Sequence, residues 1–331
     1  LQSEIEAEYG KEGLPPRPAN ARQRGVSKLR KEYALKPEFK QLWERIKHKT
    51  RYAVKIDSSK LVTDVAAELD NEKIGAPRVA ITKVQVDLGD DDVLVPLQMS
   101  GAKTVLDLSG RYPLPNLVEI IGNLMEHTTP PLRLSRRTLL EVYSRCKNKK
   151  AAVDNPQEFA TVTANALKEK LADQLIDGIK YERISEWYEM TQFVGEVESW
   201  QEYLVPSKRT SGAAGASLYD NVTVDSETER KFVEGLEQRD DVKLYVKLPS
   251  WFTVTTPIGE YNPDWAIVLE DRDAHGAKKD LLYLVRETKS TTKLEELRPD
   301  ERRKIKCGEK HFKDTLGVNY AVVTNASDLH K

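Results

Sequence analysis

The last third of the chain shows the clearest pattern of hydrophobic and polar positions. Stretches with helical spacing are mixed there with stretches of two-residue alternation, which predicts helices and strands in one domain. The predicted elements are a helix opened by a capping box at Ser226 and Glu229, a strand over 242–248, a hairpin with arms 251–256 and 262–269, a strand over 281–289, a helix beyond Pro299 and a strand over 320–324. This order is typical of an α/β domain with a mixed central sheet flanked by helices.

The first two thirds of the chain contain a looser succession of elements. A helix opened by Pro37 carries an apolar stripe, made of Phe39, Leu42, Trp43 and Ile46, that must pack on another part of the protein. Short β-rich runs follow between residues 52 and 108, and further helices are predicted over 114–125, over 135–147 and from Asn155 onward. We therefore expect a mixed α/β connector over residues 1–205.

Residues 206–218 have no hydrophobic period. Their first part reads Pro-Ser-Lys-Arg-Thr-Ser-Gly-Ala-Ala-Gly-Ala, a composition typical of linkers. We expect a flexible linker over 206–218 and a separate domain over 219–331.

Length and composition narrow the class of protein. The chain has 331 residues, enough for about two domains, and 32% of them are charged. No apolar run reaches the roughly 18 residues that a membrane-spanning helix needs. Only two cysteines are present, without metal-ligand spacing, so no disulfide framework or zinc site is predicted and a cytoplasmic location is expected. The chain starts at Leu1 without Met or signal peptide, and we expect it to be part of a longer protein.

Charge is segregated along the chain, although the formal net charge is only −1. Residues 17–60 contain fourteen Lys and Arg against four Asp and Glu, and residues 132–150 contain seven against one. Two interpretations remain open for both stretches. They are packed helices with a solvated basic face, or they are surfaces that contact the phosphates of a nucleic acid.

Ionisable side chains appear where two apolar strands of the last domain end. Asp264 opens the second arm of the predicted hairpin, and Glu287 and Lys289 end the apolar face of the strand over 281–289. The carboxylates of Asp264 and Glu287 and the carbonyl of Thr288 are hard oxygen ligands suited to Mg²⁺. Such an ion polarises a phosphate, and Lys289 can position the attacking water or offset negative charge in the transition state. This set of residues is the one that phosphodiester hydrolysis needs.

Glu229 has two interpretations. It lies in the middle of the helical stripe formed with Phe232, Val233 and Leu236, where an unpaired carboxylate is costly unless it binds a cation. It can therefore complete the metal site. It can also simply close the capping box that Ser226 begins.

Several motifs together resemble the nuclease domain of restriction (Res) subunits of type III restriction enzymes, a domain of the PD-(D/E)xK superfamily. They are Pro263-Asp264-Trp265-Ala266, Glu287-Thr288-Lys289, the segment from Thr256 to Asn262, and Ser226-x-x-Glu229-x-x-Phe232. The stretches from Phe39 to Trp43 and from Tyr52 to Ile56 also resemble the region that follows the helicase motor in those subunits. The resemblance covers most of the chain and implies a restriction-endonuclease-like fold in its last domain.

The resemblance also implies an activity and partners. The family cleaves double-stranded DNA with Mg²⁺, driven by an ATP-dependent motor in the same subunit, and a modification methyltransferase subunit supplies site recognition. This chain has neither a phosphate-binding loop nor an acidic Walker B-like motif. The ATP-dependent motor is therefore expected in the preceding part of a longer chain. The alternative is a scaffold that joins the motor to the modification subunit and does not cleave DNA.

Overall fold

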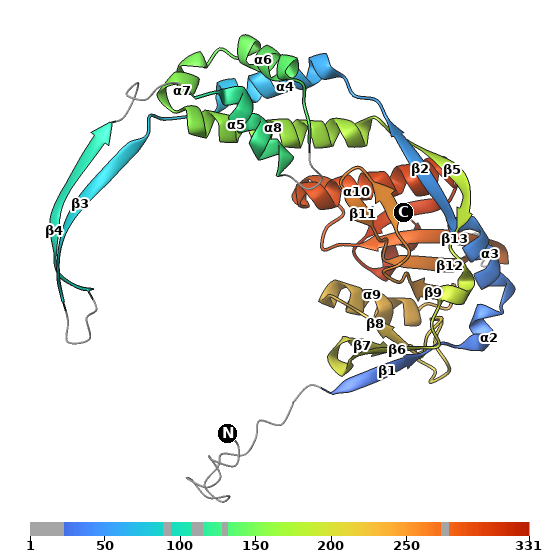
Figure 1. Cartoon of the computed structure of the whole chain (residues 1–331). Helices are drawn as coiled ribbons and strands as arrows, with labels where there is room; N and C mark the ends of the chain where they lie inside the picture. Colours follow the sequence, from blue (N-terminus) through green and yellow to red (C-terminus); the bar gives the residue numbers. More distant parts are fainter. Residues whose placement is uncertain (1–22, 89–93, 108–114, 128–131, 273–277, 331) are drawn as a thin grey trace, which may run out of the picture. The chain divides into compact units, whose positions relative to one another are not determined.

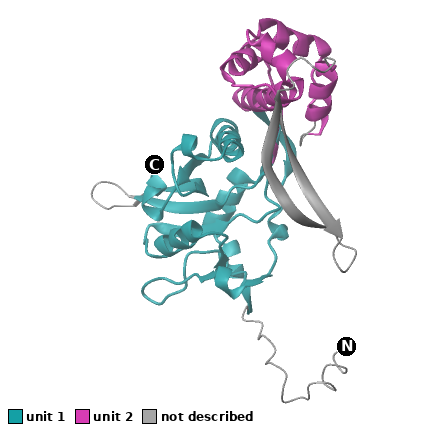
Figure 2. Ribbon diagram, turned by 90° about the vertical axis from the view of Figure 1, so that its left-hand side faces the viewer, with its two compact units in different colours: residues 1–51, 181–255, 260–331 teal, residues 52–180, 256–259 magenta. Residues whose placement is uncertain are grey.

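A computed structural model describes residues 23–88, 94–107, 115–127, 132–272 and 278–330 (Figure 1). The chain forms two compact units (Figure 2). Unit 1 consists of residues 1–51, 181–255 and 260–331, and unit 2 of residues 52–180 with 256–259. This division differs from the predicted boundaries at 205 and 219, because the first 51 residues and residues 181–218 belong to the same unit as the last domain. Among the described residues, no helix has both the length and the apolar character that crossing a membrane requires.

Unit 1 is built on a four-stranded mixed sheet. Its strands are β9 (Val242–Lys247), β12 (Trp265–Arg272), β13 (Lys278–Thr288) and β14 (Asn319–Val323), in the spatial order β14-β13-β12-β9. β12 runs antiparallel to both β9 and β13, whereas β13 and β14 are parallel. The mixed sheet flanked by helices is the architecture predicted for the last domain.

Helices cover both faces of this sheet. On one face, α9 (Glu227–Glu237) places Phe232, Val233 and Leu236 in one core with Trp265 and Ile267 of β12. On the other face, α10 (Pro299–Glu309) and the π-helical stretch after it (Lys310–Thr315) pack against Tyr320 of β14. On this second face β12 itself is contacted by α3 (Pro37–Ile46), so residues 265–269 are completely buried although their side chains alternate between the two faces.

The predicted hairpin has a different partner pattern in the structure. β10 (Val254–Thr256) pairs with β11 (Gly259–Tyr261) around a tight turn, in which Gly259 has a φ of 104°. The arm predicted over 262–269 becomes β12, which pairs with β9 and β13 instead. Burial of β12 between two long strands outweighs local pairing across the turn.

Residues 206–218, predicted as a flexible linker, lie inside unit 1. Ser207 and residues 216–218 are buried. The buried carboxylate of Glu237 accepts hydrogen bonds from the hydroxyl of Ser207 at 2.5 Å and from the amide of Ala216 at 3.0 Å. Small and polar residues are therefore held here by hydrogen bonds to one carboxylate, a type of order that leaves no hydrophobic period in the sequence.

The helix predicted from Pro37 is α3 (Pro37–Ile46), and its apolar stripe is fully buried. Phe39 and Trp43 pack in an aromatic cluster with Phe193 and Trp251, at ring-centroid distances of 5.2 to 6.3 Å. Further elements of unit 1 are α2 (Lys31–Ala34), β1 (Arg24–Lys28) paired with β6 (Glu196–Trp200), and β7 (Leu204–Pro206) paired with β8 (Asn221–Thr223). The segment before the predicted linker thus forms part of the same core.

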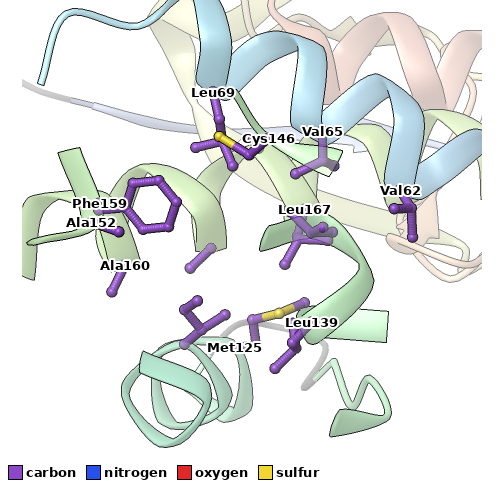
Figure 3. Packing of buried hydrophobic residues seen from close by; sticks show 14 of the residues in the cluster. Val62, Val65, Leu69, Met125, Leu139, Cys146, Ala152, Phe159, Ala160 and Leu167 are labelled. Carbon is purple, nitrogen blue, oxygen red and sulfur yellow. The ribbon is translucent and has the colours of Figure 1, made fainter. Parts of the chain in front are cut away.

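Unit 2 is mainly helical. Its helices are α4 (Ser58–Asn71), α5 (Leu117–Glu126), α6 (Arg136–Arg145), α7 (Lys149–Asp154) and α8 (Pro156–Asp177). Side chains from these helices, among them Val65, Leu139 and Leu167, point into one apolar core (Figure 3). Asp57, Ser135 and Asn155 cap the starts of α4, α6 and α8 with their side-chain oxygens.

Two further pairs of strands are present. β3 (Arg78–Leu88) pairs antiparallel with β4 (Leu94–Asp107) in unit 2. β2 (His48–Val54) pairs with β5 (Ile179–Trp187), and both strands have residues in unit 1 and in unit 2. The mixed α/β connector expected over 1–205 is therefore divided: residues 52–180 belong to the mainly helical unit 2, and its other described residues belong to unit 1.

Replacing Phe232 with Ala tests the core of unit 1. We expect the free energy of unfolding to fall by about 3–5 kcal/mol, because a fully buried aromatic ring leaves a cavity. All five tryptophans lie in unit 1, so tryptophan fluorescence during urea unfolding reports on this unit. Glu234→Ala, on the exposed face of the same helix, should change the value by no more than about 0.5 kcal/mol. An equal effect of both variants would show that α9 does not contribute to the core.

Candidate active site

The pairing of β12 with β13 brings the predicted catalytic residues to one end of the sheet. Trp265 lies opposite Arg286, so Asp264, one residue before β12, is next to Glu287 and Thr288 at the end of β13. Lys289 follows directly and extends from the same end. The structure therefore places Asp264, Glu287 and Lys289 together, although Asp264 and Glu287 are 23 positions apart in the sequence.

Asp264 is held by the residue that follows Glu287. Its Oδ2 accepts hydrogen bonds from both the backbone amide and the hydroxyl of Thr288, each at 2.7 Å. The Thr288 hydroxyl in turn accepts a hydrogen bond from the indole of Trp265 at 3.2 Å. Burial raises the pKa of Asp264, and the bonds from Thr288 offset part of this rise. Among the described residues, Oδ1 of Asp264 accepts no such bond and remains for another ligand.

Glu287 is buried and uses its two oxygens differently. Oε2 accepts a hydrogen bond from the hydroxyl of Tyr261 at 2.6 Å, and Oε1 lies 3.0 Å from Nζ of Lys289. Burial, together with the nearby charge of Asp264, raises the pKa of Glu287 to about 7, although Lys289 and Tyr261 act in the opposite direction. Two carboxylates thus share a site in which the positive charge of Lys289 does not fully offset the cost of ionising both.

Lys289 provides the positive charge at this end of the sheet. Besides Glu287, its ammonium faces Glu301 of α10, at 3.9 Å. Burial lowers the pKa of Lys289, but the carboxylates of Glu287, Asp264 and Glu301 together outweigh this and leave the pKa above its ordinary value. The side chain is about a quarter exposed, at 24%, so it faces the solvent from which a water or a phosphate would arrive.

Glu229 caps the start of α9, and its role in a metal site stays a prediction. Its backbone amide donates a hydrogen bond to the hydroxyl oxygen of Ser226 at 3.2 Å, and its carboxylate accepts a hydrogen bond from the amide of Asp225 at 2.9 Å. The same carboxylate lies 2.6 Å from Nζ of Lys247 on β9. Its charge also reaches Asp264, whose pKa it helps to raise. Glu229 is therefore a capping residue paired with a lysine, at the margin of the carboxylate pair.

The carboxylate pair fits Mg²⁺ by the chemistry of its donors. No group of three or more His, Cys, Asp or Glu side chains in the part of the chain that the structure describes is arranged to hold a metal ion. Mg²⁺ does not need such a group, since it commonly takes one or two carboxylates together with waters and substrate phosphates. Burial raises the pKa values of both Asp264 and Glu287, the charge of Asp264 raises that of Glu287 further, and a divalent cation would offset this repulsion.

Sequence reasoning assigned no role to three groups that the structure places at the site. These are the hydroxyl of Tyr261, the side chain of Thr288 and the ammonium of Lys247. A sequence signal existed only for Lys247, an ionisable residue at the end of a predicted strand, as Lys289 is. Tyr261 and Thr288 act through hydrogen bonds to residues of other strands or loops, and such bonds leave no periodic pattern in the sequence.

The described basic residues of the stretch over 17–60 make mostly exposed ion pairs. On β1 and β2, Arg24 and Lys28 face Glu198 and Glu196, and Arg51 faces Glu182. In the stretch over 132–150, Arg133, Arg137 and Lys150 also face carboxylates. These pairs are consistent with the interpretation of solvated basic faces, and contact with phosphates stays a prediction.

Residues 215–326 match the family model described as an endonuclease domain. The match covers about a third of the chain and includes α9, the four-stranded sheet, Asp264, Glu287 and Lys289. No curated protein matches the chain significantly, and neither does any solved structure. This part of the chain is a restriction-endonuclease-like domain with a mixed α/β fold, and its class indicates nuclease activity.

The raised pKa of Glu287 predicts how stability depends on pH. Between its ordinary value of 4.5 and about 7, the folded protein keeps the proton that the unfolded chain loses, so this carboxyl stabilises the fold at low pH and ceases to do so as the pH rises through 7. In EDTA, we expect the free energy of unfolding to fall by about 1–3 kcal/mol more in the unmodified protein than in Glu287→Gln between pH 4.5 and 7.5. Urea unfolding at several pH values measures the difference. Parallel pH profiles of the two proteins would contradict the assignment.

Proposed function

We propose that this chain carries the nuclease centre of a Mg²⁺-dependent endonuclease that hydrolyses phosphodiester bonds of double-stranded DNA. The observation that carries the proposal is the convergence of Asp264, Glu287 and Lys289 at one end of the β12–β13 pair. The match of residues 215–326 to an endonuclease domain supports the same conclusion independently.

The roles of the residues follow from their contacts. Mg²⁺, when bound, polarises the scissile phosphate and lowers the pKa of a water. Asp264 and Glu287 would hold the ion, and Thr288 fixes the orientation of Asp264 through two hydrogen bonds to its Oδ2. The carbonyl of Thr288 is the further ligand that the sequence suggests. Lys289 would orient the attacking water or offset charge on the phosphate, and Glu229 has a secondary role beside Lys247.

We further propose that the endonuclease is part of a type III restriction enzyme in the cytoplasm. The support is the resemblance of the motifs around Asp264 and Glu287 to the Res subunits of these enzymes. In this arrangement an ATP-driven motor in the same subunit brings DNA to the site, and a modification methyltransferase subunit recognises the sequence. The chain alone would then cleave DNA poorly.

The alternative is a scaffold that joins motor and modification subunit without cleaving DNA. A scaffold has no need to keep two carboxylates buried beside each other, since their repulsion destabilises the fold. The close approach of Lys289 to Glu287 and the double anchor of Asp264 therefore favour a nuclease that cleaves.

Replacing Asp264 or Lys289 with Ala in the complete restriction complex should abolish DNA cleavage. We expect the rate to fall by at least about 10²–10³-fold, because the metal or the positive charge at the phosphate is lost. ATP hydrolysis and DNA binding should continue, since both depend on other parts of the complex. Lys293→Ala, an exposed lysine close to Lys289 in the sequence, serves as the control and should cleave normally. Cleavage by either active-site variant would exclude the assignment.

Metal binding by the chain itself provides a second test. Mg²⁺ or Mn²⁺ should raise the melting temperature of the unmodified chain, because the ion binds the folded carboxylate pair and not the unfolded chain. At metal concentrations about 100 times Kd, the stabilisation expected is roughly 2.7 kcal/mol. Asp264→Asn should abolish the shift, and Asp240→Asn, at an exposed aspartate of the same unit, should retain it. The scaffold alternative is favoured if no divalent ion shifts the melting temperature.

A further inference from the structure

Two buried tyrosines stand behind Glu287. The hydroxyl of Tyr261 lies 2.6 Å from Oε2 of Glu287 and 2.6 Å from the hydroxyl of Tyr320. The exposed fractions of Tyr261 and Tyr320 are 4% and 2%, so these bonds form inside the domain and away from bulk water. Tyr261 belongs to β11 and Tyr320 to β14, so the two residues are 59 positions apart in the sequence.

The three groups have a defined order of donors and acceptors. An ionised carboxylate only accepts hydrogen bonds, and each tyrosine hydroxyl has one proton to donate. Tyr261 therefore donates to Glu287, and it accepts the proton of Tyr320. This series of hydrogen bonds engages Oε2 of Glu287 and leaves Oε1 on the side of Lys289.

The rings of both tyrosines are held in place by α10 and the stretch after it. A Cβ at Gly308 would lie only 2.6 Å from Cε1 of Tyr261 and 3.1 Å from the hydroxyl of Tyr320, so the helix backbone approaches both rings as closely as glycine allows. Phe312 stacks on Tyr320 with a centroid distance of 5.7 Å and an interplanar angle of 7°. The hydroxyl pair therefore has little freedom to turn away from Glu287.

We propose that Tyr261, supported by Tyr320, is a positioning residue that holds Glu287 so that its Oε1 faces the metal ion. This inference rests on the proposed function, because it assigns Glu287 to the metal site. Tyr261 does not touch the ion or the DNA. It acts as the outer partner of a metal ligand, a type of contact whose removal weakens metal binding about 10–100-fold in other sites.

The test uses the variant Tyr261→Phe, which removes the hydroxyl and keeps the ring. The melting temperature of the full chain is measured against the concentration of Mn²⁺ and, separately, of Mg²⁺. We expect the half-saturating metal concentration to rise about tenfold in the variant. Equal half-saturating concentrations in the variant and the unmodified chain would overturn the inference and leave the proposed function intact. If no metal affects the unmodified chain, both the proposed function and the inference fail.

Tyr245→Phe is a matched control for the loss of a buried hydroxyl. Tyr245 is completely buried in the same unit, and its hydroxyl donates to the buried carboxylate of Glu237 at 2.7 Å. Both variants lose one hydrogen bond to a buried carboxylate, so both should melt at a lower temperature than the unmodified chain. Only Tyr261→Phe should change the half-saturating metal concentration. A similar change in both variants would show a general structural effect and overturn the inference.

A second variant decides the question if Tyr261→Phe does not fold. Tyr320→Phe removes the donor to Tyr261 and leaves the bond between Tyr261 and Glu287 available. We expect a smaller rise of the half-saturating metal concentration, about threefold, because Tyr261 is then held less firmly. An unchanged metal response in Tyr320→Phe, with Tyr261→Phe unfolded, would overturn the inference.

Discussion

The repulsion between two buried carboxylates, Asp264 and Glu287, is the constraint on which the candidate site depends. Burial raises both pKa values because it disfavours the charged forms, and the nearby charge of Asp264 raises that of Glu287 further. The neighbouring groups reduce this cost only in part, through hydrogen bonds from Thr288 and Tyr261 and through the ammonium of Lys289. A protein gains nothing in stability from such an arrangement, which is why it indicates a function.

The sheet makes this arrangement possible. β12 is buried on both faces, by α9 on one and by α3 on the other, so its end is rigid and the position of Asp264 is defined by the core. Each carboxylate is then held through one oxygen by neutral donors, Oδ2 of Asp264 by Thr288 and Oε2 of Glu287 by Tyr261. The opposite oxygens remain for a cation or for Lys289. Stability of the core and geometry of the site are thus properties of the same strands.

Much of the domain could be predicted from local pattern. The order of helices and strands after residue 226 and the apolar rows that end in Asp264 and Glu287 are visible in the sequence, because burial imposes a period on each element. The partner of each strand was harder to predict. The expected hairpin is replaced by pairing of β12 with β9 and β13, and the expected linker over 206–218 is buried around Glu237. Both differences arise from contacts between residues far apart in the chain.

The sequence by itself determined which residues are candidates for the chemistry: two carboxylates and a lysine at the ends of apolar strands, together with the absence of a phosphate-binding loop for ATP. The tertiary structure alone decided how these residues are held. Register across β12 and β13 places Thr288 against Asp264, and packing of α10 at Gly308 places Tyr261 and Tyr320 behind Glu287. The physical reason is that hydrophobic periods record which face of an element is buried, whereas a hydrogen bond between distant strands depends on register and on the close approach of backbones.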